Sequence, residues 1–132
     1  MDLIERMHQG LSKRYPEAHF DAGDGWIRYR PSSDSGFEVG FCISGSDYII
    51  NFDSWHDHFE DEESALDWFV FGLSNDCRLK IVSKGGRPFR WIVESHHQGD
   101  WQFEREMVVL PLLFWRRAST AYRQNHLRVQ RS

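Results

Sequence analysis

The sequence holds only two cysteines, Cys42 and Cys77, and this scarcity excludes two common ways of stabilising a small protein. Two thiols can neither build a disulfide framework nor complete a zinc quartet. Long apolar runs are also missing, because the longest, residues 107–115, is interrupted by Pro111 and falls short of the ~20 residues that span a bilayer. The N-terminal residues lack the basic and then apolar order of a signal segment. We therefore expect a cytoplasmic protein that makes no contact with a membrane.

Aromatic side chains, by contrast, are abundant. They make up 15% of the 132 residues and include six tryptophans and ten phenylalanines. Hydrophobic residues reach 40% and charged residues 27%, a balance that excludes both wholesale disorder and a fibrous repeat. A chain of this length buries roughly two-thirds of its unfolded surface, which is enough for one core without covalent staples. We expect one domain over residues 1–122 and a basic tail over residues 123–132.

Charge is divided unevenly along the chain. Residues 1–77 carry 16 acidic and 5 basic residues, whereas residues 78–132 carry 4 acidic and 11 basic ones. The pI of about 5.9 argues against a continuous basic face, so we do not expect nucleic-acid binding. The basic end of the chain fits a solvated tail, an arm that binds a polyanion, or a contact with the acidic half of another copy.

Alternation of apolar and polar residues predicts a first antiparallel meander. Its three strands are expected at residues 26–30, 37–44 and 47–52. A two-residue turn that starts at Gly45 joins the last two strands and leaves one face that is apolar throughout. For the first strand we expect Tyr29 to lie opposite Phe37. That register also places Trp26 over Gly40, where an aromatic ring covers a strand glycine.

A second antiparallel meander follows from the same alternation. We expect strands at residues 78–83 and 88–95, joined by a three-residue loop, and then a third strand after a five-residue loop at residues 96–100. The third strand turns three apolar side chains towards the core: Trp101, Phe103 and Met107. Arg105 falls on the same side, beside Trp91. We place it at the rim of the sheet, because a fully buried arginine without an acid is destabilising.

Two helices are expected at residues 2–13 and 61–73, where apolar residues recur at helical spacing. The second helix begins with acidic residues, which the helix dipole favours. Its apolar surface is unusually wide, because Trp68 and Phe71 lie outside the main stripe. Such a helix is either sandwiched between layers or covered by another subunit. The predicted fold is α+β, with the order α-βββ-α-βββ and a terminal strand or helix within residues 108–122.

The best candidates for metal-binding or catalytic residues lie between the first meander and the second helix. His56 and His58 are two apart, so in an extended segment they share one side, as two metal ligands could. Asp53, Asp57 or Glu60 could orient them or add a ligand. An H-x-H pair without a third ligand at a defined spacing is also common on protein surfaces. The histidines are therefore structural or surface residues, metal ligands, or residues that contact a ligand or sense pH. The alternative function is a small-ligand or metal-dependent enzyme centred on His56, Asp57 and His58.

No catalytic constellation is visible elsewhere in the sequence. The serines lie in expected turns, and the chain has no nucleophile elbow, Walker loop or dinucleotide-binding motif. Neither Cys42 nor Cys77 has a basic partner at a fixed spacing. We therefore name no catalytic residue and expect neither a bound metal nor another cofactor.

Three tryptophans lie where contact with a partner is expected. Trp26 falls on the outer face of the first meander, Trp55 in the histidine segment, and Trp68 beside the helix stripe. Exposed aromatic residues often anchor protein interfaces. We therefore predict six binding residues: Trp26, Trp55, His56, His58, Trp68 and Phe71.

Four short segments carry a resemblance to known proteins. They are Trp55-His-Asp-His-Phe, Ala65-Leu-Asp-Trp-Phe, Cys77-Arg-Leu-Lys and Gly86-Arg-Pro-Phe-Arg-Trp91. Together they resemble a family of small bacterial proteins without assigned function, over residues 48–115, which implies a bacterial cytoplasmic domain and supplies no activity. The layout is also similar to that of type III secretion chaperones and chaperone-like regulators, which are dimers that bind an extended partner segment. The third strand of the second meander and the basic tail depart from that layout.

These observations together favour a binding protein over an enzyme. The wide apolar surface of the second helix has to be buried against another layer or subunit, and the sequence shows no set of catalytic residues. We expect a non-enzymatic module that binds protein or peptide, acts as a homodimer, and has a chaperone-like or regulatory role.

Overall fold

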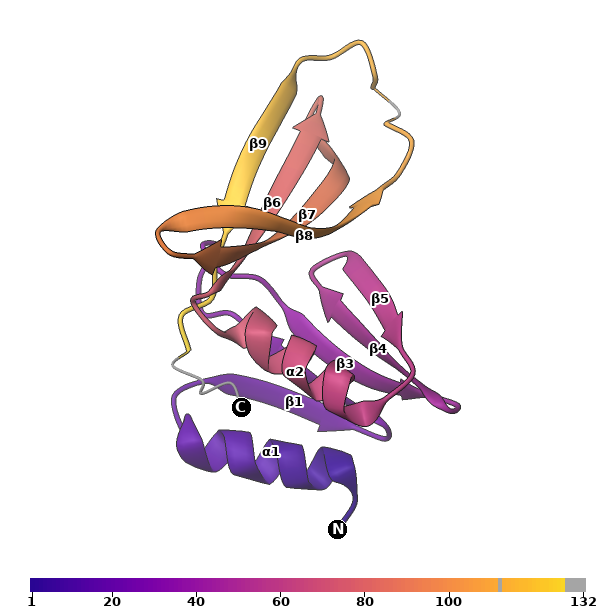
Figure 1. Ribbon diagram of the computed structural model, residues 1–132, viewed down its shortest axis with the longest axis vertical. Helices are drawn as coiled ribbons and strands as arrows, with labels where there is room; N and C mark the ends of the chain where they lie inside the picture. Colours follow the sequence, from indigo (N-terminus) through magenta and orange to yellow (C-terminus); the bar gives the residue numbers. More distant parts are fainter. Residues whose placement is uncertain (112, 128–132) are drawn as a thin grey trace.

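The computed structural model describes residues 1–111 and 113–127 of the chain, which form an α+β fold (Figure 1). The helices are α1 (Leu3–Arg14) and α2 (Glu62–Leu73). The first sheet is an antiparallel meander in chain order: β1 (His19–Gly23), β2 (Trp26–Arg30), β3 (Val39–Ser44), β4 (Asp47–Phe52) and β5 (Trp55–Phe59). The second sheet has the order β8-β7-β6-β9: β6 (Cys77–Lys84), β7 (Arg87–His97), β8 (Asp100–Val108) and β9 (Ala118–Arg123). The α+β class is confirmed, but the prediction of two three-stranded meanders is wrong, because the described residues form sheets of five and four strands.

Both helices begin after an aspartate that caps the first turn. The Asp2 carboxylate accepts a hydrogen bond from Glu5 N at 2.9 Å, and the Asp61 carboxylate accepts one from Ser64 N, also at 2.9 Å. The hydrogen bonds from Ser64 hold the pKa of Asp61 below its ordinary value of 3.8, because the charged carboxylate is the better acceptor. The predicted helix boundaries are confirmed to within one residue.

The central hairpin of the first sheet has the predicted register. Ser44 pairs with Asp47 across the turn, and Phe41 pairs with Ile50. Gly45 occupies the turn with φ at +62°, a conformation that glycine adopts without a steric penalty. The face that the sequence predicts to be apolar throughout lies on the core side, except near the turn, where Ile43 is 38% exposed.

Strands β1 and β5 extend this sheet on both sides and were not expected from the sequence. Strand β1 carries one large apolar residue, Phe20, and so gives a weak alternation signal. Strand β5 has Trp55 and Phe59 on the core side, but Asp57 stands between them and breaks the apolar pattern. Short strands of this kind form because a neighbouring strand supplies their backbone hydrogen bonds.

Strand β2 pairs with β3 two residues away from the predicted register. Tyr29 lies opposite Val39, so its predicted position opposite Phe37 is wrong. Because the shift is an even number of residues, Tyr29 keeps its place on the apolar face. The backbone of Phe37 is already occupied: its N–H donates to Asn125 Oδ1 and its carbonyl accepts from Asn125 Nδ2, both at 3.0 Å.

Both hairpin turns of the second sheet contain two residues, at positions 85–86 and 98–99, and all four have positive φ. The predicted three-residue and five-residue loops are therefore wrong. The shorter turn alone would put the wrong residues of β7 on the core face. A β-bulge after Val82 adds one residue and returns the apolar residues to that face. Leu79 consequently still lies opposite Val93, as the sequence predicts.

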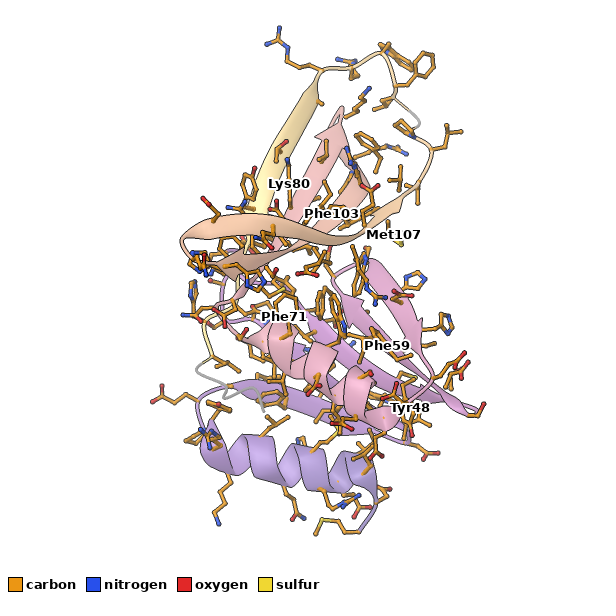
Figure 2. All side chains as sticks on the ribbon, viewed as in Figure 1. Tyr48, Phe59, Phe71, Lys80, Phe103 and Met107 are labelled. Atoms are coloured by element: carbon orange, nitrogen blue, oxygen red, sulfur yellow. The ribbon has the colours of Figure 1, made fainter. Side chains whose placement is uncertain are left out.

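A second bulge lies in β8 and leaves Glu104 with no residue opposite it in β7. One extra residue exchanges the two faces of a strand on either side of the bulge. Trp101 and Phe103 therefore point to the outer side of the second sheet, and their predicted core positions are wrong. Met107, beyond the bulge, packs against the core as predicted (Figure 2).

A single hydrophobic cluster joins the two sheets. Helix α1 packs on β1 and β2, whereas α2 packs on β3, β4 and β5 and leads directly into β6 (Figure 1). The second sheet therefore stands at the end of α2, and its inner side closes the core. The largest fully buried side chains are Trp55, Phe41, Phe52 and Phe69.

The C-terminal part of the chain returns to the first half of the domain after strand β9. Asn125 Nδ2 donates to Gly72 O at 3.0 Å, in addition to its bonds with the loop before β3. The backbone N–H of Leu127 donates to the last carbonyl of α2 at 3.1 Å. Residues 123–127, which the sequence assigns to a basic tail, are thus bonded to the domain, and residues 128–132 lie outside the described residues.

Candidate functional site

Three of the predicted binding residues belong to the core or its edge. Trp55 is 1% exposed and Phe71 is 4% exposed. Trp68 is half-buried, and its ring stacks on that of Trp55 with 5.8 Å between centroids and meets Phe71 edge-on at 5.3 Å. Phe59 lies 5.8 Å from Trp68 on another side. Helix α2 is therefore sandwiched between layers of its own chain and needs no second subunit to cover these rings.

Arg105 closes this aromatic cluster from the second sheet. Its guanidinium carbon lies 4.8 Å from the centroid of the Trp68 ring and 5.2 Å from that of Phe59. Its Nη1 donates to the Asp57 carboxylate, although both side chains are more than a third exposed and solvent weakens the pair. The sequence correctly puts Arg105 on the core side, but its partners are Trp68 and Asp57 of the first half rather than Trp91.

The histidine segment is strand β5, and it separates the three residues of the candidate metal site. His56 and His58 share one exposed face, as the sequence predicts for an extended segment. Asp57 points to the opposite face, where it binds Arg105. His56 Nδ1 lies 3.2 Å from Ser54 O. Within residues 1–111 and 113–127 the structure contains no group of three His, Cys, Asp or Glu side chains that could hold a metal.

Trp26 occupies the outer face of the first sheet but not the predicted position. It pairs with Gly23 in β1 and its indole covers that glycine, where an added Cβ would clash with the ring. The Arg28 guanidinium lies 5.4 Å from the Trp26 ring centroid. Gly40 is covered instead by the side chain of Asn51. Trp26 is half-buried, so the hairpin itself uses most of its surface.

The outer side of the second sheet carries a set of aromatic and cationic side chains that the sequence did not predict. Phe103 is 60% exposed and Tyr122 is 51% exposed. Between Trp101 and Tyr122 lies the Arg78 guanidinium carbon, 4.4 Å from the first ring and 4.3 Å from the second. Arg78 Nε also donates to Glu94 at 2.9 Å. We call this surface the aromatic face and define it by Arg78, Lys80, Trp101, Phe103 and Tyr122.

The charges on and around the aromatic face are partly compensated. Arg90 pairs with Glu106 at 2.7 Å on the same side of the sheet. Lys80 lies in register with Tyr122, with its Nζ 5.9 Å from the ring centroid (Figure 2 labels Lys80 and Phe103). The bulge at Glu104 turns Phe103 outwards, and no periodic pattern in the sequence marks a bulge. The alternation of apolar and polar residues could therefore not predict this surface.

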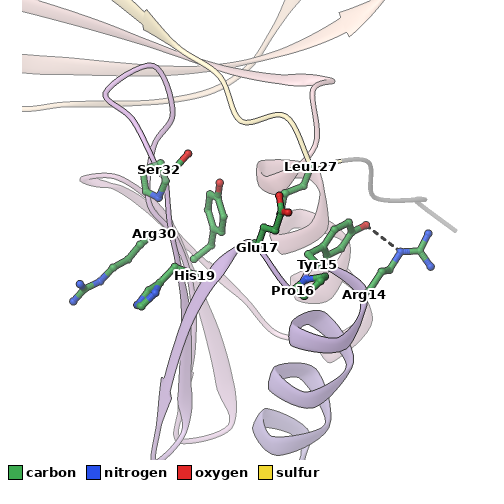
Figure 3. Close-up of a pocket in the computed structure, with 11 residues that line it drawn as sticks. Arg14, Tyr15, Pro16, Glu17, His19, Arg30, Ser32 and Leu127 are labelled. Atoms are coloured by element: carbon green, nitrogen blue, oxygen red, sulfur yellow. Dashed lines mark hydrogen bonds between the residues drawn. The ribbon is translucent and has the colours of Figure 1, made fainter.

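A pocket of about 610 Å³ lies between the end of α1, the start of β1 and the end of β2 (Figure 3). Its lining includes two cations, but Arg14 donates to Tyr15 Oη at 3.1 Å and Arg30 pairs with Asp21 at 2.9 Å. Burial raises the pKa of Tyr29, which also lines the pocket, so this phenol stays neutral. These side chains are engaged by the domain, and they do not form a catalytic set.

Neither a family model, nor a curated protein, nor a solved structure matches this chain. The resemblance to a family of small bacterial proteins and the likeness in layout to secretion chaperones therefore stay predictions. Among the described residues, no helix is both long enough and apolar enough to cross a bilayer.

Proposed function

We propose that this protein is a non-enzymatic protein-binding module of the cytoplasm that acts as a homodimer and pairs through the aromatic face. The sequence placed the contact at Trp68 and Phe71, which the chain itself covers. The observation that carries the new placement is the exposure of two large aromatic residues, Phe103 and Tyr122, on one side of a sheet. Aromatic side chains of this kind anchor protein interfaces because they bury much apolar area and lose little conformational entropy.

The charge pattern of the aromatic face supports a second copy as the partner. In a twofold dimer the same surface meets itself, so it must offer both signs of charge. The ion pairs Arg78–Glu94 and Arg90–Glu106 do so. Lys80 adds one cation that can approach a carboxylate of the other copy. A face with cations alone would repel its copy.

A peptide partner has a place at the edge of the same sheet. Strand β9 pairs with β6 on one side, and the residues along it are exposed almost throughout. An edge strand can accept an extended segment through backbone hydrogen bonds. We propose that a chaperone-like or regulatory role would use this edge, next to Tyr122.

The dimer is tested by sedimentation velocity over a range of protein concentrations. Phe103→Asp is expected to weaken self-association by about 30-fold or more, because it puts a charge at the centre of the contact. Ile43→Asp is the matched control, because Ile43 is a 38%-exposed apolar residue of the first sheet. The control should associate like the wild type, and circular dichroism should show that both variants remain folded. A wild-type protein that stays monomeric at about 100 µM would rule the dimer out.

The metal-dependent alternative has lost its geometric support. His56 and His58 share a face that Asp57 does not share. Two exposed imidazoles alone are a weaker ligand set than the three or four donors of zinc sites. We therefore propose a binding function in preference to a metal-dependent reaction at these residues.

A further inference from the structure

The connection between β8 and β9 exposes the most apolar part of the sequence. Leu110 is 84% exposed, Phe114 is 68% exposed and Trp115 is 65% exposed. Val108, the last residue of β8, and Val109, the first residue after it, are also exposed. We call residues 109–111 and 113–117 the distal loop, because Figure 1 shows this connection at the end of the molecule opposite α1. A cluster of exposed apolar side chains of this size marks a surface that meets something other than water.

The distal loop is held in place by the end of the second sheet. Lys84 Nζ donates to Phe114 O at 3.2 Å, and Arg116 N donates to Leu113 O at 2.9 Å across a turn. The rings of Phe114 and Trp115 meet edge-on with 5.4 Å between centroids. These contacts leave the apolar side chains outside, so the fold presents them instead of hiding them.

The charged residues of the distal loop and of the adjoining β6–β7 hairpin end are all cations. Four cations lie on the loop and on the adjoining β6–β7 turn: Lys84, Arg87, Arg116 and Arg117. Residues 107–127 contain no acidic residue at all. The preceding carboxylate, Glu106, is already paired with Arg90. The end of the molecule is therefore apolar and cationic together.

We propose that the distal loop docks on the surface of a membrane that contains anionic lipids. Apolar and aromatic side chains enter the region between headgroups and acyl chains, while the cations stay at the level of the phosphates. Each cation near such a surface contributes about fivefold to the affinity. The protruding shape of the loop fits a bilayer better than a protein partner. A fluid bilayer surface adapts to the loop, whereas a protein partner would need a complementary cavity.

The absence of a spanning segment does not conflict with this proposal. The sequence predicts no membrane contact because no apolar run is long enough to cross a bilayer, whereas peripheral docking needs only an exposed loop with cationic flanks. The surface is also separate from the aromatic face. The proposal therefore stands or falls independently of the proposed dimer.

The test is co-sedimentation of the full chain with vesicles of phosphatidylcholine, alone or mixed with about 30% phosphatidylglycerol. We expect binding to the anionic vesicles that weakens at high salt and little binding to phosphatidylcholine alone. Leu110→Asp and Phe114→Asp should each reduce the affinity by about tenfold or more. Replacing Arg116 and Arg117 by alanine removes two of the four cations and should lower the affinity for anionic vesicles by about 25-fold. Ile43→Asp, which changes an exposed apolar residue far from the loop, should bind like the wild type.

Tryptophan fluorescence provides a second measurement that does not depend on sedimentation. The wild type should show a blue shift on anionic vesicles that is lost in Trp115→Phe. Failure of the wild type to bind anionic vesicles would overturn the proposal, as would full binding by Leu110→Asp. If Leu110→Asp instead weakened self-association in solution, the loop would be a protein interface and the proposal would be wrong.

Discussion

Replacing Trp55 by alanine is expected to lower the free energy of unfolding by about 3–5 kcal/mol. Trp55 is 1% exposed and is among the largest fully buried side chains. Its ring lies 4.9 Å from that of Phe52 and 5.8 Å from that of Trp68. The substitution would open a large cavity between the first sheet and α2, which the rigid surroundings can fill only in part.

Urea denaturation followed by circular dichroism measures this effect. Trp26→Ala is the matched control, because Trp26 is half-buried on the outer face, where its ring lies against Gly23 and Arg28 instead of in the core. We expect the control to lose about 1 kcal/mol. Equal losses for the two variants would mean that Trp55 is not a core residue, and a surface role for it would then have to be reconsidered.

The second large effect is expected at Asn125. Its side chain is buried, at 2% exposed, and makes three hydrogen bonds of 3.0 Å, two with Phe37 and one with Gly72. Asn125→Ala would leave one N–H and two carbonyls without partners inside the protein. Since an unsatisfied buried polar group is destabilising by about 1–3 kcal/mol, we expect a total loss of about 2–4 kcal/mol.

The control for Asn125 is its neighbour in sequence. Gln124 donates one side-chain hydrogen bond to Asn75 O at 2.6 Å, in an exposed position. Gln124→Ala should therefore lower the free energy of unfolding by less than about 1 kcal/mol in the same denaturation experiment. If Asn125→Ala were as mild as Gln124→Ala, the C-terminal segment would not secure the loop before β3.

Local patterns in the sequence predict much of this fold. The capping aspartates Asp2 and Asp61 mark both helix starts, and the turn at Gly45 sets the register of β3 and β4. These features depend on residues close together in the chain, where spacing decides the geometry. The α+β class followed from them.

Features that depend on distant residues were missed. Tyr29 is displaced by two residues because Asn125, nearly a hundred positions later, occupies the backbone of Phe37. A shift of two keeps every side chain on its face, so alternation cannot detect it. The bulge at Glu104 has the opposite effect, because it preserves the strand and exchanges its faces.

The same limit explains the candidate site. The sequence showed that Trp68 needed a cover, but not that Arg105 of the second sheet would provide it. It grouped His56, Asp57 and His58 by proximity, whereas the strand turns the aspartate the other way. Phe103 was predicted to lie in the core because the strand was assumed to alternate without interruption, whereas a bulge at Glu104 exchanges its faces. For Trp68 and Phe103, the missing information was a contact between the two sheets or a break in periodicity. The position of Asp57 instead follows from the same alternation that puts His56 and His58 on one side.

The measurement that tests the account most directly is hydrogen–deuterium exchange of the wild-type protein at low and high concentration. If the protein pairs through the aromatic face, raising the concentration should slow exchange in residues 101–108 and 118–123. Exchange in α2 should be unchanged, because its own chain already covers it. Slower exchange confined to α2, with none in the second sheet, would contradict the account and restore the helix as the contact between copies.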